Sequence, residues 1–194
     1  SLALLDDDRI LCSRALDHDR KTTQALAVEM QDALAAHDWT PRSIDLVAVA
    51  RGPGSFTGIR IAVTTAKTLA YATGSAIIAV DTLQVIAAAA PTESAPIWSV
   101  LDAQRGQVFA ARYARSDTGE LDELQAARVW DFESWSDSLQ TGDYVTGPAL
   151  ARYAEQLPAE IAPVDPAHWA PQATWVGRLA LADYQAGRRD DVWQ

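Results

Sequence analysis

Two short apolar runs frame an alanine-rich stretch, and this arrangement constrains the fold more than any other feature of the chain. The runs are "IDLVAVA" at 44–50 and "AIIAV" at 76–80. Both are nearly continuously apolar, as strands covered on both faces are. The stretch between them predicts a helix from Ile59 to about Thr73, closed by Gly74. Strands joined by a helix favour a parallel pair with a right-handed crossover, so the sequence indicates an α/β fold.

The segment before this unit predicts a hairpin and a helix. "SLALL" and "ILCSRAL" are short apolar runs separated by the turn-like "DDDR", which is typical of a β-hairpin. The next segment, 22–37, switches to helical spacing. Asp19, Thr22 or Thr23 is expected to cap this helix. Its apolar stripe consists of Leu26, Met30, Ala33, Leu34 and His37.

The second half of the chain gives weaker signals. Asp81 or Thr82 is expected to cap a helix that runs to about Ala90, and a loop, "APTESAP", follows. "IWSVLDA" and "QVFAARYA" then predict a second hairpin. Beyond Gly119 we expect a short helix in "DFESWSDSL", a strand end in "YVTG", a helix in "ALARYAEQL" and an amphipathic helix at about 173–187.

Composition and charge exclude several classes of protein. The 194 residues carry a formal net charge of −10, which argues against a broad nucleic-acid-binding face. No apolar run approaches the roughly 20 residues of a membrane span. The acidic start of the chain does not resemble a signal peptide, and a single cysteine, Cys12, fits a reducing compartment. These features predict a cytoplasmic protein that binds no membrane.

The glycine-rich stretch "RGPGSFTGIR" at 51–60 matches none of the common phosphate or nucleophile motifs. A P-loop requires Lys after its last glycine, but Ile59 follows Gly58. The glycine spacing is one residue too long for a dinucleotide fingerprint, and the residues around Ser55 do not form a nucleophile elbow. Two alternatives stay open. The stretch is either a tight turn whose Ser55 or Thr57 caps the next helix, or a weak anion site at its backbone N–H groups.

No set of side chains indicates catalysis or metal binding. The three histidines, His18, His37 and His168, are too far apart in sequence to form a helical ligand pair. Asp102 is the best isolated carboxylate, but we expect it to accept hydrogen bonds within the turn of the second hairpin. We therefore predict no catalytic residue, no metal and no cofactor.

Two blocks of the sequence resemble the TsaB (YeaZ) family. The first is the turn Arg51, Gly52, Pro53, Gly54, Ser55, Phe56, Thr57, Gly58, with the helix after it and "VDTL" at 80–83. The second is "LDAQRGQVFAARY" at 101–113, which is similar to a hairpin of the family. One departure is Thr22, which stands where the family often has histidine.

This resemblance implies an actin-like (ASKHA, ribonuclease H-like) fold of two lobes. We expect an N-terminal lobe at 1–95 and a C-terminal lobe at 96–194, with the last helix packing back on the first lobe. Family members have a first strand before the segment that matches "SLALL". We therefore expect about a dozen further residues at the N-terminus, which is the reach of one strand and a turn.

The resemblance also implies a function without catalysis. TsaB is regarded as a partner subunit that stabilises TsaD, the transferase in the threonylcarbamoyladenosine modification of tRNA beside the anticodon. A TsaE-like ATPase joins that pair, and tRNA is contacted only indirectly. The alternative is an ATP-binding or glycoprotease-like enzyme of the actin-like superfamily.

The helix after the glycine turn carries the candidate partner surface. One stripe of it is too polar for a core, yet it includes an aromatic ring and long aliphatic stems. It is either an ordinary solvated face or a face for TsaD or, in a homodimer, a second copy. The stripe consists of Arg60, Thr64, Lys67, Thr68 and Tyr71.

Overall fold

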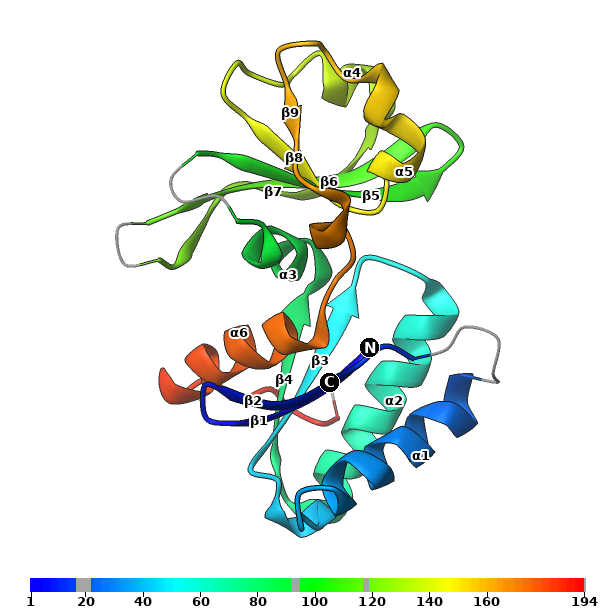
Figure 1. The fold of residues 1–194 in the computed structure, drawn as a ribbon, viewed down its shortest axis with the longest axis vertical. Helices are drawn as coiled ribbons and strands as arrows, with labels where there is room; N and C mark the ends of the chain where they lie inside the picture. The colour runs from blue at the N-terminus through cyan, green and yellow to red at the C-terminus, as the bar shows by residue number, and fades with distance from the viewer. Residues whose placement is uncertain (17–21, 92–94, 117–118, 194) are drawn as a thin grey trace. The chain divides into compact units, whose positions relative to one another are not determined.

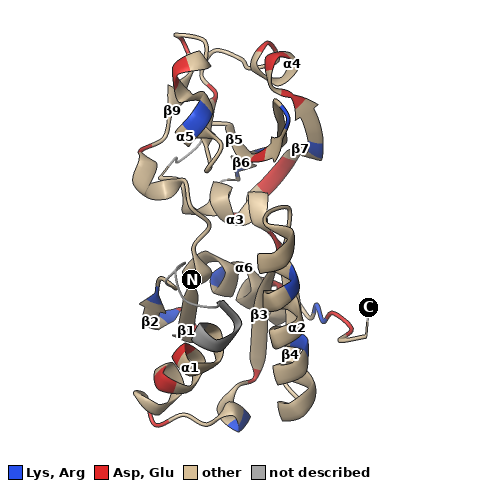
Figure 2. Cartoon of the chain, turned by 90° about the vertical axis from the view of Figure 1, so that its right-hand side faces the viewer, with Lys and Arg blue, Asp and Glu red and all other residues tan. Residues whose placement is uncertain are grey.

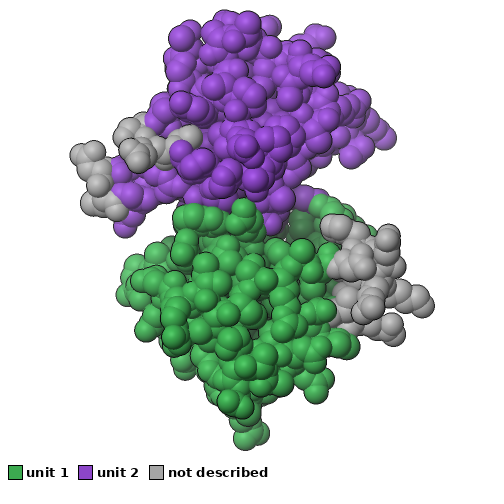
Figure 3. All heavy atoms as spheres, in the orientation of Figure 1, with its two compact units in different colours: residues 1–51, 55–80, 172–194 green, residues 52–54, 81–171 purple. Residues whose placement is uncertain are grey.

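The computed structural model describes residues 1–16, 22–91, 95–116 and 119–193 (Figure 1). Contacts divide the chain into two compact units (Figure 3). Unit 1 comprises Ser1–Arg51, Ser55–Val80 and Gln172–Gln194, and unit 2 comprises Gly52–Gly54 and Asp81–Pro171. The lobe division expected from the sequence, at 95/96, stays a prediction.

Unit 1 contains the predicted N-terminal hairpin. Strands β1 (Leu2–Asp6) and β2 (Arg9–Arg14) pair antiparallel, with an irregularity between Leu4 and Leu5. Helix α6 (Ala173–Gln185) packs against this hairpin. The approach is close because a Cβ added at Gly177 would lie 2.9 Å from a methyl carbon of Leu5.

The predicted strand–helix–strand unit is confirmed. Strands β3 (Leu46–Gly52) and β4 (Ala76–Asp81) are neighbours in a two-stranded sheet. The Ala76 N–H donates to the Asp45 carbonyl at 2.9 Å, which joins the starts of the two strands, so they run parallel. Between them lies α2 (Phe56–Thr73). Small residues let this helix approach the sheet, and the buried cluster consists of Val49, Ala66, Ala70 and Ile77.

Both ends of α2 follow from local side chains. The helix begins at Phe56, three residues before the predicted Ile59, because Ser55 serves as its N-cap. The Ser55 hydroxyl accepts a hydrogen bond from the Gly58 N–H at 3.3 Å. At the other end Gly74 adopts a left-handed φ of 78°, a conformation that costs glycine little.

Helix α1 (Thr22–Ala35) confirms the predicted helix but ends two residues before the predicted end, so His37 of the apolar stripe lies in the turn that follows. Ala33 and Leu34 are buried, and Leu26, Met30 and His37 are half-buried. The expected caps fall outside what the structure describes: Asp19 lies in an undescribed segment, and the side chains of Thr22 and Thr23 are not described.

Unit 2 is built on a five-stranded sheet in the order β7-β6-β5-β8-β9. Strands β5 (Ile97–Gln104) and β6 (Gln107–Arg115) form the predicted second hairpin. Strand β8 (Tyr144–Thr146) pairs parallel with β5 and with β9 (Ala162–Pro163).

Short helices complete unit 2. Helix α3 (Thr82–Ala89) is capped by Asp81, whose carboxylate accepts from the Leu83 N–H at 2.8 Å, as predicted. Helix α4 (Phe132–Ser136) confirms the predicted short helix. Helix α5 (Leu150–Tyr153) is shorter than predicted, because it continues as a 3-10 turn at Ala154–Gln156.

Strand β7 (Leu121–Asp131) is an element that the sequence did not predict. It is one of the two edge strands of the five-stranded sheet, and all of its residues are exposed or half-buried. With so little apolar surface to bury, it lacks the alternation that marks a half-buried strand.

The expected additional N-terminal strand stays a prediction. Among the described strands, β1 pairs with β2 and β3 pairs with β4, and the two pairs share no ladder. None of the helices in the described part of the chain combines the length and apolarity that a membrane span requires.

Candidate functional site

The glycine turn is a tight bend that joins β3 to α2. Gly52 is buried with a φ of 110°, and the Gly52–Pro53 bond is cis. Gly54, Ser55, Phe56 and Thr57 are exposed. The Gly58 N–H, one of the groups considered for an anion site, is already bonded to the Ser55 hydroxyl. This observation favours the capping alternative.

The predicted stripe of α2 faces solvent along most of its length. Arg60, Thr64, Thr68 and Tyr71 are exposed, and Lys67 is half-buried. Tyr71 is 69% exposed, although its ring is large and mostly apolar.

An aromatic ring that the stripe did not include lies at the start of the same helix. Phe56 is 72% exposed, and the Arg60 guanidinium lies 4.5 Å from the centre of its ring. This separation is typical of a cation–π contact. The exposed face of α2 therefore has an aromatic residue near each end.

A second residue missed by the sequence analysis is Trp193, beyond the last helix. It is 76% exposed, and its ring centre lies 5.4 Å from that of Tyr71 at an interplanar angle of 70°. This is the edge-to-face arrangement that aromatic pairs prefer. The short polar segment around it has no periodic pattern that could have revealed the contact.

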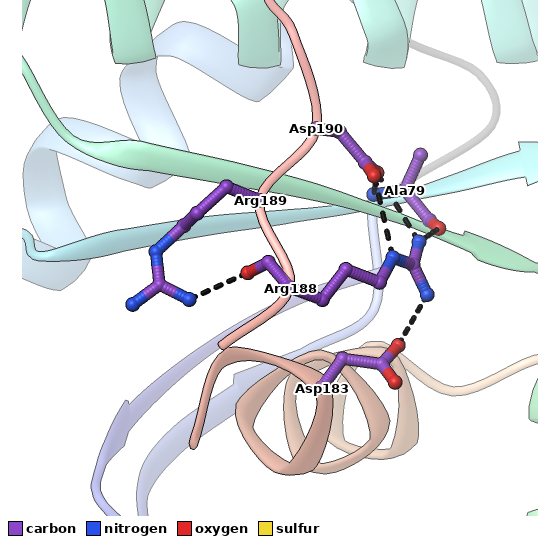
Figure 4. Close-up of polar contacts among 5 residues, drawn as sticks. All are labelled: Ala79, Asp183, Arg188, Arg189 and Asp190. Carbon is purple, nitrogen blue, oxygen red and sulfur yellow. Dashed lines mark hydrogen bonds and ion pairs between the residues drawn. The ribbon is translucent and has the colours of Figure 1, made fainter. Parts of the chain in front are cut away.

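The C-terminal residues Arg188–Trp193, here called the clasp, are held on strand β4 by backbone and side-chain bonds (Figure 4). The Asp190 N–H donates to the Ile77 carbonyl at 3.1 Å, and the Ala79 N–H donates to the Asp190 carboxylate at 2.7 Å. The Arg188 guanidinium donates to the Ala79 carbonyl at 2.6 Å. The clasp therefore occupies backbone N–H and C=O groups of β4 with which a further strand could otherwise pair.

Two carboxylates hold the Arg188 side chain in place. Its guanidinium contacts both Asp183, on α6, and Asp190. The hydrogen bond from Arg188 lowers the pKa of the Asp190 carboxyl, and burial opposes this effect. The hydrogen bond from the Ala79 N–H lowers the pKa of the same carboxyl further.

The contribution of the Asp190 carboxylate to holding the clasp should therefore weaken in acid. Because the folded pKa of Asp190 lies below its ordinary value of 3.8, the stabilisation is present above that value and is lost as the pH falls through the lower folded pKa. A carbon-13 NMR titration of the Asp190 carboxyl should give a midpoint below 3.8. The Arg188→Ala variant should move the midpoint upward. A wild-type midpoint at or above the ordinary value would contradict the described contacts.

Helix α2 carries basic residues and no acidic ones (Figure 2). Its 18 residues include Arg60 and Lys67 and no acidic residue. The whole chain has a net charge of −10. The exposed face of α2 is therefore a locally basic, aromatic surface on an acidic protein.

Unit 2 contains a depression of about 750 Å³ near α4, which includes Asp131, Glu133, Asp137 and Arg152 in its lining. Among the described residues, no group of three or more His, Cys, Asp or Glu side chains is placed to hold a metal ion. His37 and His168 are half-buried, and His18 lies outside the described residues. The Asp102 carboxylate accepts from the Gln104 N–H at 2.7 Å, which confirms its predicted role in the turn.

Comparison with known proteins gives consistent results. The family model "TsaD: tRNA N6-adenosine threonylcarbamoyltransferase" matches residues 16–182. The chain is 30% identical over 142 residues to the tRNA threonylcarbamoyladenosine biosynthesis protein TsaB of Bacillus subtilis, which covers 73% of this chain and 62% of that protein. It is 34% identical over 131 residues to the TsaB of Escherichia coli, which covers 66% and 57% respectively. The aligned part of the chain thus spans about three fifths of the length of these relatives.

A solved structure extends the similarity to the fold. The structure of YeaZ from Pseudomonas aeruginosa matches with a TM-score of 0.82 at 24% identity and covers 99% of this chain and 90% of that chain. The α/β fold is thus the actin-like one expected from the resemblance. Together with the family model and the curated relatives, this match shows that the chain belongs to the TsaB (YeaZ) family.

Proposed function

We propose that this protein is a non-catalytic subunit that binds and stabilises a TsaD-type transferase in the threonylcarbamoyladenosine modification of tRNA next to the anticodon. The observation that carries the proposal is the exposed face of α2. On this face Phe56 is 72% exposed and Tyr71 is 69% exposed, and the two residues lie near opposite ends of the helix. Tyr and Arg are among the residues that contribute most to protein interfaces, and this face carries both.

The charge of the chain supports a protein partner for this face. Binding tRNA directly would require many Lys and Arg contacts to phosphates, and the chain has 16 basic against 26 acidic residues. We therefore propose that tRNA is contacted only through the transferase. A TsaE-like ATPase would join the assembled pair.

The test is binding between this protein and the TsaD-type subunit of the same organism. Isothermal titration calorimetry should detect a complex, and Tyr71→Ala should weaken it by about 1–3 kcal/mol, because a truncated interface tyrosine loses its packing and desolvation. Arg60→Ala should weaken it in the same direction. Circular dichroism should show an intact fold for both variants, since the two side chains are exposed.

A matched control is Leu124→Ala on β7 in unit 2. Leu124 is 51% exposed, so its substitution also removes exposed apolar surface. The residue lies on an element outside the proposed surface. The Leu124→Ala variant should bind the TsaD-type subunit with wild-type affinity. If Tyr71→Ala and Arg60→Ala bind as tightly as the wild type, the face of α2 is merely solvated. Hydrolysis of Mg-ATP by the isolated protein would contradict the non-catalytic role.

A further inference from the structure

We infer that the clasp is part of the partner surface, where it supplies Trp193 as a second aromatic anchor beside Tyr71. This composite surface fits a protein partner that has an apolar pocket surrounded by carboxylates. The inference rests on the proposed function, because it extends the same face of α2. It adds to that function a binding element and the chemistry of the partner's surface.

The two rings form one exposed aromatic group. Tyr71 and Trp193 lie 5.4 Å apart between ring centres, yet they remain 69% and 76% exposed. Their mutual contact therefore buries little of either ring. Large exposed aromatic groups of this kind mark interaction sites, and Trp and Tyr are the side chains enriched at the centres of interfaces.

The clasp fixes Trp193 before any partner binds. Asp190 is tied to β4 through both its backbone and its carboxylate, as described above. Val192 packs against the buried cluster of α2 and the sheet, and the Trp193 N–H donates to the Asp191 carboxylate at 2.8 Å. Anchoring of the residues before Trp193 and of its own N–H reduces the conformational entropy that Trp193 would lose on binding, which increases affinity.

Charge identifies the kind of partner. Arg60 and Lys67 are the charged residues of α2, and the four charges of the clasp, from Arg188, Arg189, Asp190 and Asp191, cancel. The composite surface is therefore net basic. A second copy related by a two-fold axis through this face would place one net basic surface against another. An acidic surface on a different protein complements it.

The test compares variants of the full chain in titrations with the TsaD-type subunit. Trp193→Ala should weaken binding by roughly tenfold or more. Asp190→Ala leaves the Trp193 ring intact but removes the carboxylate that bonds Ala79, so it should weaken binding in the same direction by a smaller factor. The Tyr71→Ala/Trp193→Ala double variant should lose less than the product of the two single losses, because the rings contact each other. Leu124→Ala is again the control.

The outcomes separate the two proposals. If Tyr71→Ala weakens the complex and Trp193→Ala does not, the clasp inference is wrong and the proposed function stands. If the wild-type chain does not bind the transferase subunit, both are wrong. Raising the salt concentration from about 50 to about 500 mM should weaken the complex by screening, and unchanged affinity would overturn the acidic partner surface.

Two further measurements test other occupants of the same surface. Analytical ultracentrifugation that shows a dimer dissociated by Trp193→Ala would assign the surface to a second copy. Gel shifts that show tRNA binding lost in Trp193→Ala, with unchanged affinity for the transferase, would assign it to RNA. Either result would overturn the inference.

Discussion

Gly147→Ala is expected to unfold unit 2 or to lower its free energy of unfolding by about 4 kcal/mol or more. Gly147 is buried directly after β8 and has a φ of 126°, which is strained for any other residue. A Cβ there would lie 2.1 Å from the Val100 carbonyl oxygen and 2.8 Å from the Val100 nitrogen of β5. Since these are backbone atoms within the sheet, no side-chain rotation can relieve the clash. Urea unfolding followed by circular dichroism measures the loss.

Gly142→Ala is the matched control. Gly142 also has a positive φ, of 93°, but no heavy atom of the described residues lies within 4 Å of an added Cβ apart from its chain neighbours. Its cost should be that of backbone strain alone, about 1–2 kcal/mol. Equal losses in the two variants would show that the contact with Val100 does not determine the stability of this corner.

Asp143→Ala is expected to destabilise unit 2 by about 3–5 kcal/mol. The Asp143 side chain is 1% exposed and accepts a hydrogen bond from the Arg112 guanidinium at 2.6 Å. It also accepts from the Trp98 indole N–H at 3.1 Å and from the Gln140 N–H at 3.0 Å. Alanine would leave all three donors without this acceptor, and Arg112 would keep an uncompensated charge at a partly buried site. The measurement is the shift of the urea midpoint.

Two controls isolate the effect of burial on this ion pair. Asp143→Asn keeps an acceptor oxygen and should lower the free energy of unfolding by less than Asp143→Ala does. Asp6→Ala removes the partner of Arg9 in an exposed pair, whose side chains are 53% and 73% exposed, and should cost under about 1 kcal/mol. A loss from Asp143→Ala as small as that from Asp6→Ala would contradict the structural importance of the buried pair.

The elements that the sequence predicted well depend on local patterns. The strand–helix–strand unit follows from two apolar runs and from small residues such as Ala66 and Ala70, which pack in one buried cluster with Val49 and Ile77. Ser55 and Gly74 set the ends of the helix through interactions within four residues. Such signals are visible in a single chain because the interacting groups are neighbours in sequence.

The elements that were missed depend on distant contacts. The clasp is held by hydrogen bonds between Asp190 or Arg188 and Ala79, more than 100 residues earlier, and no local pattern encodes them. Strand β7 is stabilised by pairing with β6, and its exposed residues give no alternation. The predicted stripe of α2 was correct as an exposed face, but its contact with Trp193 required the folded structure.

The packing of α6 and the clasp in unit 1 has a consequence for synthesis on the ribosome. Unit 1 joins residues that lie far apart in the sequence, since Gly177 lies against Leu5 and Asp190 bonds to β4. These contacts cannot form until Gly177 and Asp190 have been made. Unit 2 lies almost entirely within Asp81–Pro171, so its sheet is complete earlier. During that interval the nascent β1–β2 hairpin and the edge of β4 are open to chaperones or to incorrect strand pairing.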